Sequence, residues 1–299
     1  MKELVSVVIT TYGRTSSLKR AIKSVCNQTY ENLEILVVDD NNKLELKKEV
    51  QEIVQQIADK RIYLISNQAN LGGAIARNIG IENARGNYIS FLDDDDEYLE
   101  CRIEKQMELM LNGDDMLGLV YTHCRGIKAN KKPIDYCYTY SGNCVFEGMY
   151  DCVAATSQWL CRKSALQAVG GFSNVPCKQD STVIVKLLIN GYKIDYVPEI
   201  LSLYHDDAEN RISKQGHSKR ILGEEKLRDL CRRNYNVLNK KQIREVEYSF
   251  ATRLSEHYFA VGDLKNGFIC LTKILIRHPI KKQSFGCYKR IFKSMLKRG

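Results

Sequence analysis

The chain has 299 residues, of which 44% are hydrophobic and 27% are charged, and its formal net charge is +9. This composition is ordinary for a globular protein and excludes an intrinsically disordered chain. No apolar run approaches the ~20 residues that cross a bilayer, and the N-terminus lacks a signal-peptide pattern, so a cytoplasmic protein is expected. The 11 cysteines include no C-x-x-C pair, and we expect them to be reduced and largely buried.

The N-terminal part of the chain alternates two kinds of segment, and this alternation predicts the fold class. Short runs rich in β-branched residues indicate buried strands, and the segments between them have the apolar spacing of amphipathic helices. This order predicts an α/β fold with a doubly wound, mainly parallel sheet, in which ligands bind beyond the carboxyl ends of the strands. The expected strands are 4–12, 32–40, 61–67 and 87–92, and the expected helices are 14–28, 44–58 and 71–86.

The middle of the chain is less regular, and the C-terminal part is helical. Strands of a mixed or antiparallel edge are expected over 117–127 and 132–146, and a helix that ends at Gly170 and Gly171 follows them. A further helix and strand are expected within 180–198. From about residue 215 the alternation stops and amphipathic helices follow. The expected domains are an α/β domain over 1–215 and a helical C-terminal region over 216–299.

Four adjacent aspartates, Asp93 to Asp96, directly follow the fourth expected strand. Acids after a strand often cap the next helix, and Asp96 could serve only that role. Four carboxylates exceed the needs of a cap, however, and like charges at this spacing raise one another's pKa unless a cation lies between them. Because carboxylate oxygens suit Mg²⁺ or Mn²⁺, a metal site is the favoured interpretation.

Four segments, in this order, resemble the family 2 glycosyltransferases with a GT-A fold. They are VSVVITTYGR, ILVVDDNN, NLGGAIARNIGIENARGNYISFLDDDD and KQDSTVIVKLLINGYKIDYVP, and the similarity covers most of residues 4–213. The resemblance implies a GT-A core that transfers a sugar from a nucleotide diphosphate to an acceptor hydroxyl, with inversion at the anomeric carbon. It also implies Mn²⁺ or Mg²⁺ as the cofactor.

The resemblance also implies roles for individual residues. Asp95, the second acid of the family's D-x-D motif, would hold the metal, and His205 could be a further ligand or a surface histidine beside acids. Arg211 would pair with the diphosphate. The residues expected at the nucleotide-sugar are Thr11, Tyr12, Arg14, Asp39, Asp40, Arg77, Asp93, Asp94 and Arg211.

Two further residues are assigned to the acceptor side. Asp180 would be the base that takes the proton of the acceptor hydroxyl, because the family pattern has a carboxylate at the start of a helix there. A helix N-cap is the alternative for Asp180, and both roles could coexist. Trp159 would contact the acceptor, since an indole can stack on a sugar ring, and a core position is its alternative.

The C-terminal tail is strongly basic, with no acid after Asp263. Ile291, Phe292, Met295 and Leu296 fall at helical spacing among the lysines and arginines, which suits a helix on an anionic inner leaflet. A solvated terminal helix is the alternative. Membrane contact would suit an acceptor held on a lipid carrier. The preceding helices would pack on the α/β domain or on a second subunit, so a homo-oligomer is a further expectation.

Other classes of function compete with sugar transfer. A nucleotidyltransferase also uses metal-bound carboxylates, and a non-catalytic scaffold could use a degenerate transferase fold, although Asp93, Asp95 and Asp180 argue against degeneration. TTYGRTSS, rather than G-x-G-x-x-G, follows the first strand, which disfavours a dinucleotide oxidoreductase. Nucleic acid is not an expected partner, because the best pocket is acidic.

The function expected from these residues is that of a hexosyl- or N-acetylhexosaminyltransferase in surface polysaccharide synthesis. Its donor would be a UDP-sugar, and its acceptor would be a growing, lipid-linked glycan. The enzyme would act at the cytoplasmic face of the cell membrane.

Overall fold

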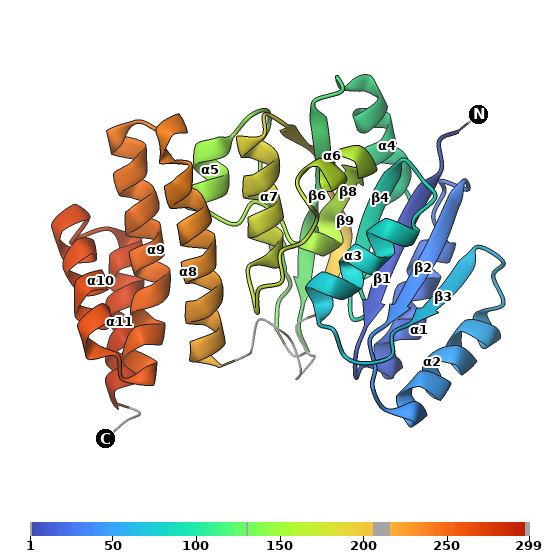
Figure 1. Cartoon of the computed structure of the whole chain (residues 1–299), viewed down its shortest axis with the longest axis horizontal. Coiled ribbons are helices and arrows are strands. Elements are labelled where there is room, and N and C mark those ends of the chain that lie inside the picture. Colours follow the sequence, from blue (N-terminus) through green and yellow to red (C-terminus); the bar gives the residue numbers. More distant parts are fainter. Residues whose placement is uncertain (1, 130, 206–215, 297–299) are drawn as a thin grey trace. The chain divides into compact units, whose positions relative to one another are not determined.

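The computed structural model describes residues 2–129, 131–205 and 216–296 (Figure 1). These residues form two compact units, of which the first contains the sheet and the second is helical. The second unit includes two segments that come before residue 215 in the sequence. The first unit lies within 1–144, 153–174 and 186–209, and the second lies within 145–152, 175–185 and 210–299.

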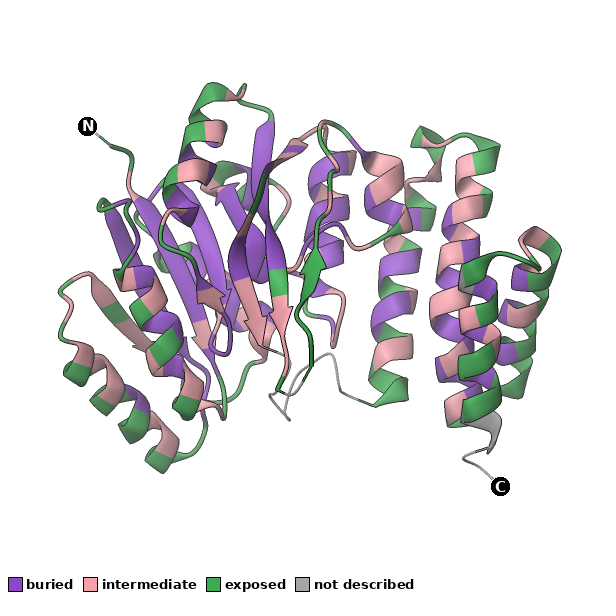
Figure 2. Ribbon diagram, turned by 180° about the vertical axis from the view of Figure 1, so that it is seen from behind, coloured by how far each residue is buried: buried purple, intermediate pink, exposed green. Residues whose placement is uncertain are grey.

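Four parallel strands, in the order β3-β2-β1-β4, form one part of the sheet, as the sequence predicts. Helices cover both of its faces, which is why β1 and β2 are almost entirely buried (Figure 2). Val7 of β1 packs in one core with Leu18 of α1, whereas Val8 faces Gly80 of α3. A Cβ on Gly80 would lie 2.3 Å from the Val8 side chain, so glycine permits this close approach. The elements are β1 (Val5–Thr11), α1 (Thr15–Cys26), β2 (Leu33–Asp39), α2 (Leu44–Ile57), β3 (Ile62–Ser66), α3 (Gly73–Asn83) and β4 (Tyr88–Asp93).

The remaining strands make the sheet mixed, and β6 lies inside it. β6 pairs with β8 in the antiparallel sense and with β9 in the parallel sense. The expectation that this region forms an edge is therefore wrong for β6, because its partners come from later segments that the local sequence does not reveal. Among the described residues the order is β3-β2-β1-β4-β8-β6-β9-β5, with β7 on β6. The elements are β5 (Glu97–Tyr98), α4 (Arg102–Asn112), β6 (Leu117–Ile127), β7 (Ile134–Tyr136), β8 (Trp159–Arg162), α6 (Lys163–Ala168) and β9 (Lys193–His205).

A fully buried arginine, Arg102, links strands β4 and β8 near the acidic run Asp93 to Asp96. Its guanidinium lies 3.6 Å from the centroid of the Tyr98 ring and donates hydrogen bonds to Ser90 Oγ (3.0 Å) and to the carbonyl oxygen of Trp159 (3.1 Å). These contacts replace part of the hydration that the cation loses on burial. Because Ser90 belongs to β4 and Trp159 to β8, Arg102 ties the two strands together close to Asp93.

The second unit is built around α9, against which α8, α10 and α11 pack. Asn239 caps α9 by accepting hydrogen bonds from the backbone of Lys241 and Gln242, and Gly262, with φ of 86°, ends it. The predicted amphipathic helices and the terminal helix are confirmed. The elements are α5 (Val145–Tyr150), α8 (His217–Arg233), α9 (Lys240–Val261), α10 (Leu264–Arg277), α11 (Lys282–Leu296) and α7 (Gln179–Ile189), of which residues 179–185 belong to this unit.

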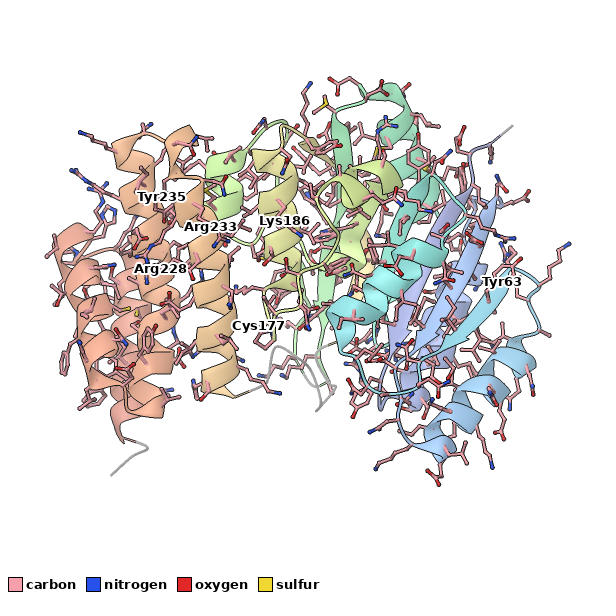
Figure 3. The ribbon with its side chains drawn as sticks, viewed as in Figure 1. Tyr63, Cys177, Lys186, Arg228, Arg233 and Tyr235 are labelled. Carbon is pink, nitrogen blue, oxygen red and sulfur yellow. The ribbon has the colours of Figure 1, made fainter. Side chains whose placement is uncertain are left out.

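Ion pairs on one face of α9 hold these helices together. Glu247 lies 2.5 Å from Arg228 and 2.8 Å from Arg232 of α8, and 3.1 Å from Lys273 of α10. The hydroxyl of Tyr235, which follows α8, donates to the same carboxylate at 3.0 Å (Figure 3). Burial raises the pKa of Glu247, but the hydrogen bonds from Arg228 and Arg232 outweigh it and hold this pKa below its ordinary value. Glu247 is therefore ionised and joins three helices.

Candidate functional site

The strand register brings the polar ends of β1, β2 and β4 to one edge of the sheet. Thr11 at the end of β1 lies opposite Asp39 at the end of β2, and Thr10 lies opposite Asp93 at the end of β4. Parallel strands bring their carboxyl ends to the same edge, so residues from three distant segments meet there. The convergence predicted from the sequence is thus present.

The four aspartates form a turn at this edge. The backbone amide of Asp96 donates to the carbonyl oxygen of Asp93 at 3.1 Å, which closes the turn. Oxygens from the carboxylates of Asp93, Asp95 and Asp96 all lie within 4.8 Å of one another. Hard oxygen donors at this spacing fit a divalent metal ion. Asp96 is part of this set, and it does not cap α4, which begins at Arg102.

Two arginines contact the acidic turn. Arg14, just after β1, lies 2.7 Å from Asp94 and 2.6 Å from Asp95. Arg77, on α3, lies 2.6 Å from Asp93. Both were expected at the nucleotide, and the structure brings both guanidinium groups to the acids. Their two positive charges would offset half of the negative charge of four ionised carboxylates.

Asp94 is the most deeply buried acid of the turn. Burial raises the pKa of Asp94 to about 7, with Arg14 opposing this rise and Asp95 adding to it. The backbone amide of Tyr12 donates to the Asp94 carboxylate at 3.3 Å. Asp94 therefore fixes the loop after β1, and the Tyr12 side chain on that loop is 48% exposed.

Asp39 and Asp40, the acids after β2, are also buried and bonded within the protein. Asp39 accepts hydrogen bonds from the backbone amide (3.0 Å) and the side chain (2.7 Å) of Asn41. Asp40 accepts from the backbone amides of Leu71 (3.0 Å) and Gly72 (2.8 Å), which lead into α3. Both acids thus shape the loops that border the carboxyl edge.

His205 and two residues that the sequence did not single out complete the surroundings of the turn. His205 Nε2 lies 2.6 Å from Glu97, and the His205 backbone amide donates to Asp96 at 3.3 Å. Ser157 Oγ donates to Asp96 at 2.8 Å and accepts from the backbone amide of Asp93 at 3.1 Å. Nothing in the sequence around Ser157 signals this role, which depends on β8 lying beside β4. Glu97 directly follows the acidic run in the sequence, and this position was the signal that could have identified it.

Trp159 does not reach the surface. Its side chain is 0% exposed, and its ring stacks on Phe172 with centroids 6.0 Å apart and meets Phe91 edge to face. No face of the indole is open to a sugar in this structure. The expectation that Trp159 contacts the acceptor is therefore wrong here, and the alternative of a core position applies.

Asp180 belongs to the second unit, in the first turn of α7. Its carboxylate accepts from the backbone amide of the next residue, Ser181, at 2.7 Å. Cys152 Sγ lies 3.9 Å from the other oxygen, and burial together with the Asp180 charge raises the pKa of Cys152 to about 12. The helix begins one residue before Asp180, so the carboxylate lies inside the first turn. Arg211, the remaining predicted residue, lies outside the described residues.

Comparison with known proteins gives two kinds of similarity in sequence. The profile of glycosyl transferase family 2 matches residues 6–170. An uncharacterised glycosyltransferase of Methanocaldococcus jannaschii is 32% identical over 227 residues, which cover 72% of this chain and 76% of that protein. UDP-Glc:alpha-D-GlcNAc-diphosphoundecaprenol beta-1,3-glucosyltransferase WfaP of Escherichia coli is 36% identical over 108 residues, which cover 36% of this chain and 41% of that protein.

A solved structure extends the similarity to the fold. The mannosyltransferase PcManGT from Pyrobaculum calidifontis, in complex with GDP-Man and Mn²⁺, superposes with a TM-score of 0.63 at 15% identity. The match covers 99% of this chain and 87% of that chain. The expected GT-A fold with a C-terminal helical region is thereby confirmed.

Proposed function

This chain belongs to glycosyl transferase family 2, and from that premise we propose that it transfers a sugar from a UDP-sugar to a hydroxyl of a lipid-linked glycan, with inversion. The observation that carries the proposal is the set of three carboxylates within 4.8 Å of one another at the carboxyl edge of the sheet. An enzyme that expels a nucleoside diphosphate needs positive charge at the diphosphate, and a set of carboxylates attracts a cation that supplies this charge.

The proposed cofactor is Mn²⁺ or Mg²⁺, held by Asp95 together with Asp93 or Asp96. When bound, the cation supplies positive charge that stabilises the departing diphosphate. Arg14 positions the Asp95 carboxylate, since its guanidinium lies 2.6 Å away. His205 is retained as a candidate ligand, and its contact with Glu97 would orient its ring.

The proposed nucleotide site lies along the loops after β1 and β2. The exposed ring of Tyr12 is available to stack on the base, and Thr11 precedes it. Asp39 and Asp40 border the base or ribose through the loops that they fix. Arg77, with Arg211, is proposed to pair with the phosphates once the donor competes for its guanidinium.

Asp180 is the proposed base. Its carboxylate would accept the proton of the acceptor hydroxyl while the acceptor oxygen bonds to the anomeric carbon and the bond from that carbon to phosphate breaks. One bond forms as the other breaks, which inverts the anomeric configuration. The nucleoside diphosphate leaves with the bonding electrons, and the proton remains on Asp180.

The acceptor and the place of reaction are proposed from relatives. WfaP is named for a UDP-Glc donor and a diphosphoundecaprenol acceptor, which supports a UDP-sugar and a lipid-linked glycan for this chain. A putative teichuronic acid glycosyltransferase of Bacillus subtilis, 35% identical over 112 residues, supports a role in surface polysaccharide synthesis. We place the reaction at the cytoplasmic face of the cell membrane.

A panel of nucleoside diphosphates with and without Mn²⁺ tests this proposal by thermal shift. UDP should raise the melting temperature strongly when metal is present and little when EDTA replaces it. Product analysis with UDP-sugars should then find UDP, whereas release of pyrophosphate from a nucleotide would indicate a nucleotidyltransferase instead. If no nucleotide stabilises the protein with either metal, the proposed function fails.

A further inference from the structure

Helix α10 exposes an apolar face. Phe268 and Ile269 are 51% and 46% exposed, and Leu275 and Ile276, two turns further on, are 48% and 80% exposed (Figure 2). This spacing places the four side chains on one side of the helix. The opposite side, which includes Ile274, is buried in the second unit. α10 thus has apolar groups on its outer side as well as on its inner side.

The turn after α10 and the start of α11 continue this apolar surface. Ile280, in the turn, is 80% exposed, and Phe285, in the first turn of α11, is 57% exposed. Lys281 and Lys282 stand between them in the sequence and are also exposed. We call Leu275, Ile276, Ile280, Lys281, Lys282 and Phe285 the α10–α11 patch. Large apolar groups that share a surface with lysines are typical of a membrane-surface segment.

The charge of this region indicates which partner fits it. Residues 264–299 contain ten lysines and arginines and no aspartate or glutamate. Four of the ten, Lys273, Arg277, Lys281 and Arg290, lie against glutamates of α9. The exposed Lys282, Lys289 and Lys293 add positive charge beyond these pairs. A second copy of the chain would bring the exposed Lys282, Lys289 and Lys293 near their own counterparts, and these like charges would repel. An anionic lipid surface supplies opposite charge for the lysines and an apolar layer for Ile276 and Ile280 at the same time.

None of the described helices is long and apolar enough to cross a bilayer. The sequence predicted a membrane-facing side on the terminal helix through Ile291, Phe292, Met295 and Leu296, of which the side chains of Met295 and Leu296 lie outside those that the structure describes. Ile291 is only 5% exposed and packs inward, whereas Phe292 is 63% exposed. Among the described side chains, the exposed apolar ones of this region therefore lie mainly on α10 and the following turn.

We propose that the α10–α11 patch docks the protein on an anionic membrane surface. This inference deepens the proposed function and rests on it in one respect, because an acceptor held on a lipid carrier lies at such a surface. The apolar side chains would enter the boundary between headgroups and acyl chains, and Lys281 and Lys282 would contact lipid phosphates.

Co-sedimentation of the full chain with vesicles tests the proposal. The protein should bind vesicles of phosphatidylglycerol and phosphatidylcholine, bind pure phosphatidylcholine far less, and detach as salt rises. Replacing both isoleucines (Ile276→Ser with Ile280→Ser) should lower the partition coefficient by about tenfold or more, because each buried side chain contributes to binding. Lys281→Gln and Lys282→Gln should lower it about fivefold each at low salt. Leu44→Ser and Lys48→Gln, which change exposed residues of α2, are the matched controls and should bind as the wild type does.

Several outcomes would overturn the membrane assignment. Failure of the wild type to bind anionic vesicles is one, and equal binding by the isoleucine variant is another. A wild-type dimer in light scattering that the isoleucine variant converts to monomer, without vesicle binding, would identify a second copy as the occupant. Because the patch lies away from the proposed chemistry in sequence, the isoleucine variant should retain metal-dependent stabilisation by UDP. Loss of that stabilisation in the wild type would refute the proposed function and leave vesicle binding as a separate result.

Discussion

In the helical unit the buried Glu224 and the half-buried Glu247 lie against arginines and lysines, whereas in the sheet unit four aspartates stand side by side at the end of β4. Glu224 lies 3.1 Å from Lys178 and 2.9 Å from Arg253, and Glu247 lies against cations of α8 and α10. Neutralised carboxylates of this kind hold helices in register.

The acids at the end of β4 have a different electrostatic setting. Arg14 and Arg77 contact them, yet burial and neighbouring charge still raise the pKa of Asp94 to about 7. Ionising these neighbouring acids without a bound cation is unfavourable. The same negative charge at the carboxyl edge of the sheet attracts cations. The contrast separates Glu224 and Glu247, which pair with cations inside the second unit, from the aspartates after β4, to which we assign a metal site.

The largest effect is expected when Asp95 changes. Asp95→Asn should lower the transfer rate by about a thousandfold, because a proposed metal ligand is lost. Its loss of unfolding free energy in EDTA should be smaller than that of Glu247→Gln, since relief of repulsion offsets the lost pair with Arg14. Steady-state kinetics and urea unfolding measure the two effects, with the exposed Asp115→Asn as the control. A stability loss as large as that of Glu247→Gln would break the contrast between the units.

Asp180 is the acid of the second unit to which we assign chemistry. Asp180→Asn should lower kcat by about a hundredfold or more, because an amide cannot accept the proton, while leaving the thermal shift with UDP and metal unchanged. Asp151→Asn, at an exposed acid next to Cys152 in the sequence, is the control. Full turnover by Asp180→Asn would remove it from the mechanism and make the second unit purely structural.

Glu247 tests the structural side of the comparison. Glu247→Gln should lower the free energy of unfolding by about 1–3 kcal/mol, because three cations lose their partner; the figure is reduced for partial exposure. Chemical denaturation followed by circular dichroism measures the loss. The exposed Glu52→Gln should have little effect. Unchanged stability would show that this network is not what holds α8, α9 and α10 together.

The smallest effect concerns pH and the second unit. Burial lowers the pKa of His257 to about 4 from an ordinary value of 6.5, and the charge of Arg220 acts in the same direction. The unfolded state therefore binds more protons between these values, so stability is fully present above about pH 6.5 and falls as the pH drops toward 4. His257→Gln should have a flatter profile of melting temperature against pH. Parallel profiles would show that this histidine, whose Nδ1 lies 2.9 Å from that of His217, does not govern acid stability.

Sequence patterns predicted the parallel half of the sheet well, because its strands are continuous apolar runs that end in polar residues. The convergence of Thr11, Asp39 and Asp93 followed from the rule for parallel strands. The interior position of β6 could not be predicted, since it depends on pairing with β8 and β9 from distant segments. The helical segments of the second unit were predictable from their apolar spacing, but the inclusion of 145–152 and 175–185 in that unit was not.

Individual side chains were harder to predict than elements. A helix cap was left open as an alternative for Asp96. Its contact with Ser157 could not be predicted, because that contact requires β8 to lie beside β4. Trp159 was assigned to the acceptor because of a family resemblance, with a core position as the alternative, and its burial depends on Phe91 and Phe172 from other segments. Arg102, on the expected helix after the acidic run, gave no sign of being fully buried, since an isolated arginine in a sequence is ordinarily a surface residue.

Titration of Mn²⁺ into the protein, followed by electron paramagnetic resonance of the free ion, tests the central claim most directly. The wild type should bind Mn²⁺ and bind it more tightly in the presence of UDP, and Asp95→Asn should lose most of this binding while remaining folded. Equal Mn²⁺ affinity in the wild type and in Asp93→Asn, Asp95→Asn and Asp96→Asn would contradict a metal site at the end of β4.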